Sequence, residues 1–479
     1  MTLNISQLSI AEARAKLDAK EITAVELLDA CHATIKEKDN EIHAFLEVYD
    51  DAREMAQRAD EMIAQGKATA FTGIPVALKD NMCVTGKHAT AASKVLEGFV
   101  APYDATVVTK LKDAGAVLVG RTNMDEFAMG SSTEYSAYGP TKNPLDTSRV
   151  PGGSSGGSAA AVLAGMCLAS LGSDTGGSIR QPAALCGIVG LKPTYGSVSR
   201  HGLIALGSSL DVIGPFGKTV GDVETTFGVI AGKDAMDSTT VDECDYAQTP
   251  STKHQAPKKI GVPRRFLAEN KLREDVAANF ESALKRLAEV GYELVDIELP
   301  NVTYSVPAYY VILPAEASSN LARFDGVKYG LHKDGEGLIG DYFETRGEGF
   351  GPEPRRRIMI GTYVLSSGYY DAYYNRANAV RRLITQDFTN AFAQCDVIAT
   401  PTTAGPAFRL GEKLADPVQM YLEDVFTVSA NHTGMPAMSV PSGTVMHDGV
   451  ALPLGLQLVA PHMGESRLFV VGKRFLGEI

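Results

Sequence analysis

The sequence predicts an α/β protein, a single large domain in which helices cover both faces of a central mixed β-sheet. Short apolar segments typical of strands alternate along the chain with segments whose apolar residues recur every three or four positions, as in helices. Across all 479 residues, no change of composition marks a linker between domains. Residues 158–171 are rich in alanine and apolar on every side, which indicates a helix buried against the sheet.

The first 65 residues carry the signals of helix starts. Ser9 and Thr23 are each followed three positions later by a glutamate, and this pairing is a capping box. Apolar residues then recur at helical spacing, so these helices should bury one face against a larger body. We therefore divide the chain into an N-terminal helical region, residues 1–65, packed on the core, and one continuous α/β unit, residues 66–479.

The remaining elements follow in order along the chain. We predict strands at residues 73–79, 116–120, 259–262, 292–297, 396–400 and 454–458, and helices at residues 105–112, 158–171 and 274–290. The strand, helix and strand between positions 259 and 297 predict a crossover unit. Two segments with few apolar residues, 234–258 and 333–354, are predicted to be surface loops or edges of a cap over the sheet.

Composition and charge exclude several classes of protein. With 44% hydrophobic and 21% charged residues the chain is an ordinary globular protein, and its net charge of −12 disfavours a basic face that grips nucleic acid. The six cysteines form no C-x-x-C pair, so we expect reduced thiols and no zinc knuckle. Charged residues enter the N-terminus early, and no segment reaches the roughly 20 apolar residues that span a bilayer. We expect a soluble, cytoplasmic protein without signal peptide, membrane contact or metal site.

Two segments rich in glycine and serine, residues 152–158 and 172–182, flank the predicted buried helix. A flexible linker is disfavoured because the helix starts directly after the first segment. A phosphate loop is disfavoured because the Gly-Lys-Ser/Thr ending is missing. Residues 152–156 fit the G-x-S-x-G nucleophile elbow of α/β-hydrolases, but an elbow follows an apolar strand, and here polar residues and Pro151 precede it.

The second segment offers a better place for a nucleophilic serine, Ser178. The backbone N–H groups of the residues that lead to it can turn toward one point and form an oxyanion hole. Glycines in this run let a substrate carbonyl approach the backbone closely. The predicted donors are Thr175, Gly176, Gly177 and Ser178 itself.

A serine nucleophile needs a base, and none of the nine histidines lies in a recognisable triad signature. Lys79 is the alternative, since it ends an apolar strand and is followed by Asp80 and Asn81. A lysine at a strand end is usually a solvated charge, but burial beside the glycine and serine segments would lower its pKa and leave a neutral amine. Ser154 can then relay the proton between Lys79 and Ser178.

The three segments together resemble the amidase signature family, whose catalytic group is Ser-cisSer-Lys. The resemblance rests on Lys79 in IPVALKDN, Ser154 in GGSSGGS and Ser178 in DTGGSIRQP. It implies the family fold and a cis peptide between Gly153 and Ser154. Within the family, the chain is similar over essentially its whole length to the A subunits of bacterial glutamyl-tRNA(Gln) amidotransferases. The matching motifs are NMDEFAMGSSTE, LKPTYGSVSRHGLIALGSSLD, EASSNLARFDGVKYG, RRRIMIGTYVLSSGYYDAYY and YLEDVFTVSANHTGMPAMSVP.

This resemblance implies a site for glutamine. A free amino acid needs one fixed cation and one fixed anion in its pocket. Arg357 would hold the α-carboxylate, Asp424 the α-ammonium, and a tyrosine of the pair Tyr309 and Tyr310 would line the pocket. Without the resemblance, Arg357 would be a surface member of the basic run 355–357, and Asp424 a charge on a helix face.

The resemblance also implies an activity and partners. The chain would be the glutaminase subunit of a ligase in protein biosynthesis, forming a glutamyl ester on Ser178 and releasing ammonia. A B subunit would use this ammonia, with ATP and Mg2+, to amidate Glu-tRNA(Gln) and, as a second acceptor, Asp-tRNA(Asn). A small C subunit would complete the heterotrimer. No cofactor would bind this chain, and a short polar tail is expected beyond Ile479.

Two other functions stay open on the sequence. A stand-alone amidase of the same fold would hydrolyse a small aliphatic amide without partner subunits. A catalytically silent scaffold would only dock partners, but the presence of Lys79, Ser154 and Ser178 together disfavours it.

Overall fold

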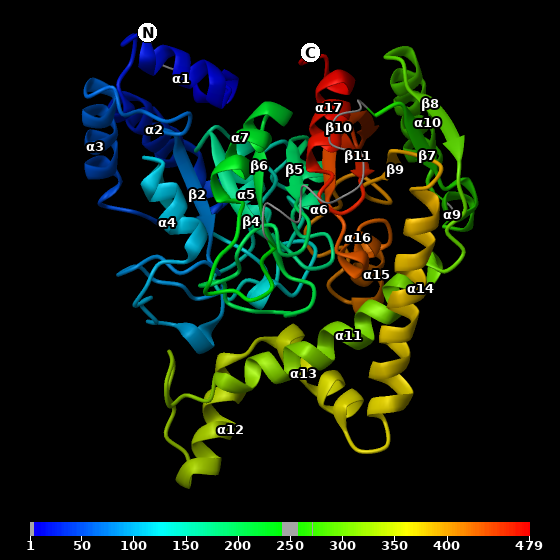
Figure 1. Cartoon of the computed structure of the whole chain (residues 1–479). Helices are drawn as coiled ribbons and strands as arrows, with labels where there is room; N and C mark the ends of the chain where they lie inside the picture. The colour runs from blue at the N-terminus through cyan, green and yellow to red at the C-terminus, as the bar shows by residue number, and fades with distance from the viewer. Residues whose placement is uncertain (1–3, 242–256, 271) are drawn as a thin grey trace.

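The structure is a computed structural model that describes residues 4–241, 257–270 and 272–479 (Figure 1). In this part of the chain, eleven strands form one sheet in the spatial order β1-β3-β2-β4-β6-β5-β10-β11-β9-β7-β8. The strands are β1 (Phe45–Val48), β2 (Pro75–Lys79), β3 (Val117–Thr122), β4 (Ala169–Asp174), β5 (Val189–Lys192), β6 (Val212–Gly217), β7 (Lys259–Val262), β8 (Glu293–Asp296), β9 (Val397–Pro401), β10 (Ala437–His447) and β11 (Val450–Val459).

The sheet is mixed. β2 runs parallel to β3 and β4, and β7 runs parallel to β8 and β9. Between these two groups, antiparallel pairs lead from β4 through β6, β5, β10 and β11 to β9. Every residue of β2, β3, β4 and β9 is buried, so both faces of the sheet are covered at these strands. The predicted fold class is confirmed.

Helices surround this sheet and form an additional layer at one end of it (Figure 1). Those before β7 are α1 (Ile10–Asp18), α2 (Ala24–Ile42), α3 (Ala52–Ala64), α4 (Thr106–Asp113), α5 (Gly156–Leu163), α6 (Arg180–Cys186) and α7 (Val220–Ile230). Those after β7 are α9 (Arg264–Glu269), α10 (Glu274–Glu289), α11 (Ser305–Asn320), α12 (Gly337–Gly349), α13 (Pro352–Leu365), α14 (Arg376–Ala391), α15 (Pro417–Tyr421), α16 (Val428–Thr433) and α17 (Glu465–Leu476).

Most predicted elements lie where the sequence places them. The capping boxes at Ser9 and Thr23 start α1 and α2, with both reciprocal hydrogen bonds formed. The predicted strands correspond to β2, β3, β7, β8, β9 and β11, and two of the predicted helices correspond to α4 and α10. β7, α10 and β8 form the predicted crossover, with the two strands parallel. Residues 1–65 also contribute β1, which pairs with β3, and the domain boundary at residue 65 stays a prediction.

The prediction of one helix over residues 158–171 is wrong. The helix α5 ends at Leu163, a turn follows, and the last three residues of the segment, 169–171, begin the buried strand β4. Gly165 has a left-handed backbone conformation with φ of 76°, which stops the helix at low cost because glycine has no Cβ. An apolar run alone does not distinguish a buried helix from a buried strand.

The prediction of loops at residues 333–354 is also wrong for most of that segment. It forms α12 and the first turn of α13, and α13 packs along α11 in the helical layer at the bottom of Figure 1. Pro352 at the start of α13 suits the first turn of a helix. The other predicted loop, 234–258, lies outside the described residues from position 242 to 256.

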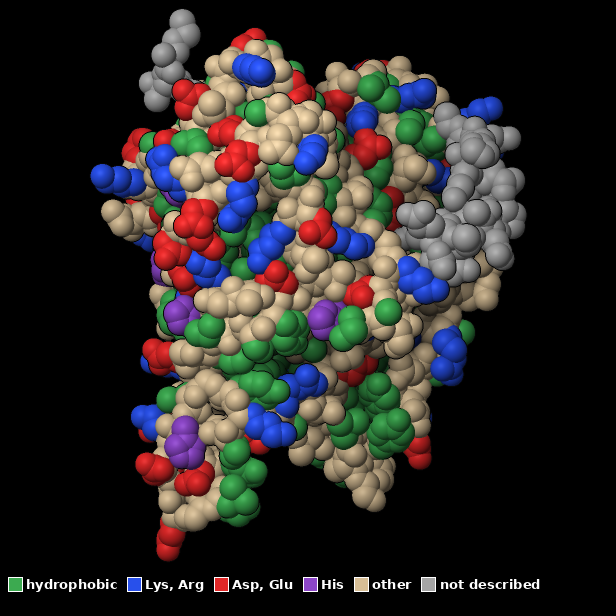
Figure 2. All heavy atoms as spheres, turned by 60° about the vertical axis from the view of Figure 1, so that its left-hand side comes forward, with side chains coloured by type: hydrophobic (Ala, Val, Ile, Leu, Met, Phe, Trp, Pro, Cys, Tyr) green, Lys and Arg blue, Asp and Glu red, His purple; other side chains and the backbone are tan. Residues whose placement is uncertain are grey.

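Charged and apolar side chains share the surface. On the face in Figure 2, lysines and arginines are interspersed with aspartates and glutamates, and apolar side chains also appear toward the lower end. Phe343 of α12 and Met359 and Tyr363 of α13 are exposed. Among the described residues, no helix is long and apolar enough to cross a membrane, and no cluster of three or more His, Cys, Asp or Glu residues is arranged to hold a metal ion.

Candidate active site

Lys79 is completely buried at the end of β2, with 0% of its surface exposed. Its Nζ lies 2.8 Å from Ser154 Oγ, 2.9 Å from Ser173 Oγ and 3.3 Å from the Ser173 carbonyl oxygen. Burial lowers the pKa of Lys79 to about 7, although nearby carboxylates oppose the shift. A large share of this amine is therefore neutral at neutral pH and able to accept a proton.

The first glycine and serine segment holds Ser154 against Lys79. The peptide between Gly153 and Ser154 is cis, as the resemblance implies. The Gly153 N–H donates to Gln181 Oε1 at 2.9 Å, and a Cβ on Gly153 would lie 2.2 Å from a carboxylate oxygen of Asp125. The same carboxylate accepts three backbone N–H groups of the 132–135 loop. Glycine is needed at position 153 because two buried loops meet there.

The second segment presents Ser178 directly after β4. Ser178 is 7% exposed, and its carbonyl oxygen accepts the N–H of Ser155, which ties the two segments together. Within the described chain, the backbone N–H groups of Gly176, Gly177 and Ser178 donate to no other group. Consecutive backbone donors without an acceptor in the protein are able to receive an oxyanion.

No hydrogen bond joins the hydroxyls of Ser154 and Ser178 in the described structure. Catalytic contacts are often long in a ligand-free enzyme and shorten when the substrate binds. The structure thus brings Lys79 and Ser154 into direct contact and ties Ser178 to the same loop. Among the described histidines, none bonds to Ser154 or Ser178, which leaves Lys79 as the basic side chain in contact with this group.

The two charged residues expected to bind substrate are buried rather than exposed. Arg357 lies on α13 and is 3% exposed, with its Nε 2.7 Å from Glu353 Oε1. Its guanidinium carbon lies 5.3 Å from the centre of the Tyr310 ring and 5.4 Å from that of Tyr421. Burial opposes the charge, but Tyr310 and Glu353 hold the pKa of Arg357 above its ordinary value. Arg357 is a fixed cation.

Asp424 faces the same group of aromatic residues. It is 7% exposed, and its two carboxylate oxygens accept hydrogen bonds from Tyr310 Oη at 3.0 Å and Ser131 Oγ at 3.1 Å. Burial raises the pKa of Asp424 to about 7, which the Tyr310 hydrogen bond and Arg357 oppose. A bound ammonium would compensate the buried charge and favour its ionised form.

Tyr309 connects this charged region with the glycine and serine segments. Its ring lies edge-on to Tyr310 at 5.0 Å between centroids. A Cβ on Gly176 would lie 2.7 Å from the Tyr309 hydroxyl, so the tyrosine packs directly on the predicted oxyanion hole. The structure therefore brings all the predicted site residues into one connected group.

Several residues of this group were not predicted from the sequence. Ser173 accepts a hydrogen bond from Lys79. Its position inside the segment 172–182 is the one feature of the sequence that points to it. Ser131 bonds to Asp424, and Tyr421 stacks on Tyr310 at 3.9 Å and donates to Glu353. Thr427 donates to the Gly176 carbonyl oxygen at 2.6 Å. Ser131 lies in the motif NMDEFAMGSSTE, and Tyr421 and Thr427 lie in YLEDVFTVSANHTGMPAMSVP, but nothing in these motifs distinguishes the three residues from their neighbours.

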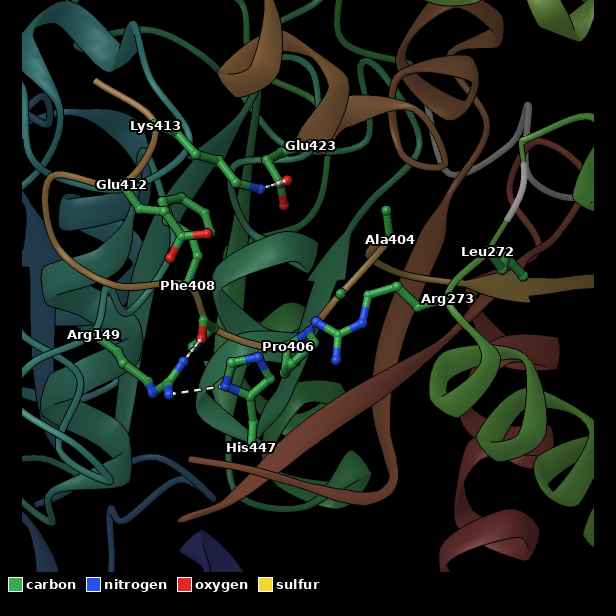
Figure 3. A pocket seen from close by; sticks show the side chains of 12 residues that line it. Arg149, Leu272, Arg273, Ala404, Pro406, Phe408, Glu412, Lys413, Glu423 and His447 are labelled. Atoms are coloured by element: carbon green, nitrogen blue, oxygen red, sulfur yellow. Dashed lines mark hydrogen bonds and ion pairs between the residues drawn. The ribbon is translucent and has the colours of Figure 1, made fainter. Parts of the chain in front are cut away.

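A separate cavity of about 270 Å³ is lined in part by Glu423, the neighbour of Asp424 in the chain (Figure 3). Its charged groups are largely paired with one another: Lys413 with Glu423, and Arg149 with His447 at 3.1 Å. None of the predicted site residues lines it. This cavity shares only the short segment around Glu423 with the candidate site, and we do not assign the chemistry to it.

The chain matches known proteins over nearly its full length. A family model described as amidase matches residues 26–469. The A subunit of the glutamyl-tRNA(Gln) amidotransferase from Desulfatibacillum aliphaticivorans is 52% identical over 473 residues, which are 98% of this chain and 97% of that protein. The crystal structure of the same-named subunit from Thermotoga maritima is 42% identical with a TM-score of 0.79, covering 98% of this chain and 95% of that one. A peptide amidase from Stenotrophomonas maltophilia is 28% identical with a TM-score of 0.81, covering 98% and 97%.

Proposed function

Because the chain belongs to the amidase family, we propose that it hydrolyses the side-chain amide of glutamine through an ester on Ser178, as the ammonia-producing subunit of a tRNA-dependent amidotransferase. The observation that carries the proposal is Lys79, which is completely buried and bonds to the hydroxyls of Ser154 and Ser173. Relatives about 50% identical over their whole length bear the name of that subunit, which supports the assignment.

The mechanism begins with two proton transfers. Neutral Lys79 takes the proton of Ser154 while Ser154 takes that of Ser178, and Ser178 Oγ attacks the amide carbon of glutamine. The developing oxyanion accepts hydrogen bonds from the backbone N–H groups of the segment Thr175 to Ser178. Each such donor typically stabilises the transition state by about 2.7 to 4 kcal/mol.

The second half of the reaction reverses the proton path. The Lys79 ammonium returns its proton through Ser154 to the leaving nitrogen, the C–N bond breaks, and ammonia departs. Water then loses a proton to the same path and attacks the glutamyl ester on Ser178. The ester bond breaks, glutamate leaves, and the Ser178 hydroxyl is restored.

Substrate recognition uses the buried charges. Arg357 binds the α-carboxylate, and the ionised form of Asp424 binds the α-ammonium, while the rings of Tyr309 and Tyr310 form the wall between them and the oxyanion hole. Arg357 and Asp424 are both buried before substrate arrives, and a bound amino acid places an opposite charge beside each of them. This arrangement favours a free amino acid over a neutral amide.

The proposal extends to the partners. Ammonia passes to a B subunit that activates the carboxylate of Glu-tRNA(Gln), or of Asp-tRNA(Asn), with ATP and Mg2+, and a small C subunit completes a cytoplasmic heterotrimer. The names of the relatives support this assembly. The net charge of −12 is consistent with a chain that leaves tRNA binding to a partner.

The test measures ammonia release from glutamine by the chain alone and by the chain co-expressed with its B and C subunits, each beside a Ser178→Ala control. We expect release that needs Ser178, and Gln-dependent amidation of Glu-tRNA(Gln) by the complex. Strong hydrolysis of small aliphatic amides by the chain alone, with no effect on Glu-tRNA(Gln), would identify a stand-alone amidase instead. Amidation from glutamine that survives Ser178→Ala would identify a silent scaffold.

A further inference from the structure

In the predicted oxyanion hole, the orientation of one peptide group is not fixed by the side chains of the two residues that form it. The peptide between Gly176 and Gly177 has a glycine on each side, and no Cβ restricts the two torsions that would rotate it. Gly177 has a φ of 148°, a conformation that few other residues adopt. If this peptide rotated, its carbonyl oxygen would replace its N–H in the hole and repel an oxyanion. The orientation must therefore be imposed from outside the segment.

The side chain of Thr427 contacts this peptide. Thr427 is completely buried, and its hydroxyl donates to the Gly176 carbonyl oxygen at 2.6 Å. A Cβ on Gly177 would lie 2.3 Å from Thr427 Oγ1, so the hydroxyl packs against both ends of the peptide. In a trans peptide the C=O and the following N–H point in opposite directions. Holding the carbonyl of Gly176 toward Thr427 thus turns the N–H of Gly177 away from Thr427.

The backbone of Thr427 is held in place by a buried ion pair. Arg180 Nη1 donates to the Thr427 carbonyl oxygen at 2.7 Å, and the same guanidinium makes a two-pronged ion pair with Asp174 at 2.9 and 3.0 Å. Burial alone would raise the pKa of Asp174, but Arg180 lowers it to about 2, so the pair stays ionised at neutral pH. Asp174 ends β4 and Arg180 begins α6. The ion pair that holds Thr427 therefore joins the two ends of the loop that carries Ser178.

We infer that Thr427 is a positioning residue for catalysis, whose hydroxyl fixes the Gly176–Gly177 peptide so that the Gly177 N–H faces the oxyanion. Thr427 touches no substrate in this role. The residue also lies one turn after Asp424, and its N–H donates to the Asp424 carbonyl oxygen at 3.1 Å. One short segment therefore holds both the carboxylate for the α-ammonium and the orientation of the oxyanion hole. The role in glutamine hydrolysis rests on the proposed function.

The test compares Thr427→Val, which keeps the shape and removes the hydroxyl, with Thr427→Ser, which keeps the hydroxyl. For glutamine hydrolysis by the complete complex, we expect Thr427→Val to lower kcat about 10- to 100-fold, because one donor moves out of place, with KM changed less than about threefold. Thr427→Ser should restore kcat to within about threefold of the wild type. The matched control is Thr226→Val on α7, where an equally buried hydroxyl donates to its own helix and lies outside the site.

A second measurement separates this inference from the proposed substrate. The rate at which a sulfonyl fluoride labels Ser178, followed by mass spectrometry, should fall about tenfold or more in Thr427→Val and be restored in Thr427→Ser, whatever the natural amide is. Slow labelling together with a wild type inactive on glutamine would support the positioning role and overturn the proposed function. Wild-type kcat and labelling in Thr427→Val would overturn the inference and leave the function intact. A kcat and KM that change together, or no rescue by serine, would indicate a structural role only.

Discussion

Two regions of the site are built on different parts of the fold. Lys79 ends β2, Ser154 lies shortly before α5, and Ser178 lies between β4 and α6, and all three are buried. Arg357 lies on α13, in the helical layer at the bottom of Figure 1, and Asp424 ends the short 3-10 helix Leu422–Asp424. The first region consists of hydroxyls, backbone N–H groups and a lysine whose pKa burial lowers toward neutrality. The second consists of buried, opposite charges enclosed by aromatic rings.

Under the proposed function, the two regions have different roles: the first moves protons and the second recognises the amino acid. Moving a proton needs a base that is neutral at the working pH, and the dry sheet interior supplies it by penalising the charged amine. Recognising an amino acid needs opposite charges: Glu353 helps to keep the buried Arg357 ionised, and a bound ammonium favours the ionised form of Asp424. The sheet region should therefore control kcat and the helical region KM.

The largest effect should come from removing the base. We expect Lys79→Ala to lower kcat for glutamine by at least about 10⁴-fold with little change in KM, because the serines lose their proton acceptor. Lys192→Met is a matched control, since Lys192 is also completely buried with a pKa lowered by burial to about 7, but its amine donates only to the Pro193 carbonyl among the described residues. Steady-state kinetics measure both variants, with thermal unfolding to check that they fold. More than about 1% of wild-type kcat in Lys79→Ala would place the base elsewhere.

The helical region is tested by Arg357→Lys, which keeps the charge but loses the planar fork that binds a carboxylate. We expect kcat/KM to fall about 100-fold, mainly through KM. Arg355→Lys is the control, because Arg355 is exposed on the same helix and should leave the kinetics unchanged. The amide 4-aminobutanamide, which lacks the α-carboxylate of glutamine, should be hydrolysed equally by the wild type and Arg357→Lys. A loss with that amide as well would show that Arg357 supports the chemistry rather than the carboxylate.

The two regions also differ in how far the sequence predicts them. The residues of the sheet region can be recognised from short segments of the sequence. Position 153 must be a glycine because a Cβ there would clash with Asp125, and the donors Gly176 and Gly177 directly precede Ser178 in the chain. The end of α5 is nonetheless not predicted, since an apolar run does not show that the helix stops at Gly165.

In the helical region, short segments of the sequence do not show which charged residue belongs to the site. Arg355, Arg356 and Arg357 are consecutive, and only the packing of α13 on α11 decides that Arg357 is the buried one. Likewise Asp424 faces Tyr310, while its neighbour Glu423 pairs with Lys413 in the cavity of Figure 3. The roles of Arg357 and Asp424 are predicted from the family resemblance alone, because tertiary packing decides which face of a helix is buried.

The pH dependence should show both regions acting together. In the proposed mechanism Lys79 accepts a proton only when neutral, above its pKa of about 7, and Asp424 binds the substrate ammonium only when ionised, above its pKa of about 7. Acidification below pH 7 therefore removes both active forms, and log kcat/KM should fall with a slope approaching two. In Asp424→Asn, the lower activity that remains should fall with a slope near one. An unchanged slope in that variant would show that Asp424 is not the second titrating group.

The smallest effect should come from the edge of the helical region, at Tyr421. Its ring stacks on Tyr310 and faces the Arg357 guanidinium, while its hydroxyl donates to Glu353 Oε1 at 2.8 Å, the same oxygen that binds Arg357. Tyr421→Phe keeps the ring and removes one of the two hydrogen bonds to that oxygen, a loss of about 1 kcal/mol, or about fivefold in KM. Tyr421→Ala removes the ring as well and should raise KM further, with kcat still near the wild type. If Tyr421→Phe instead lowered kcat and left KM unchanged, the separation of the two regions would fail, because a group that contacts only the recognition charges would be controlling the chemical step.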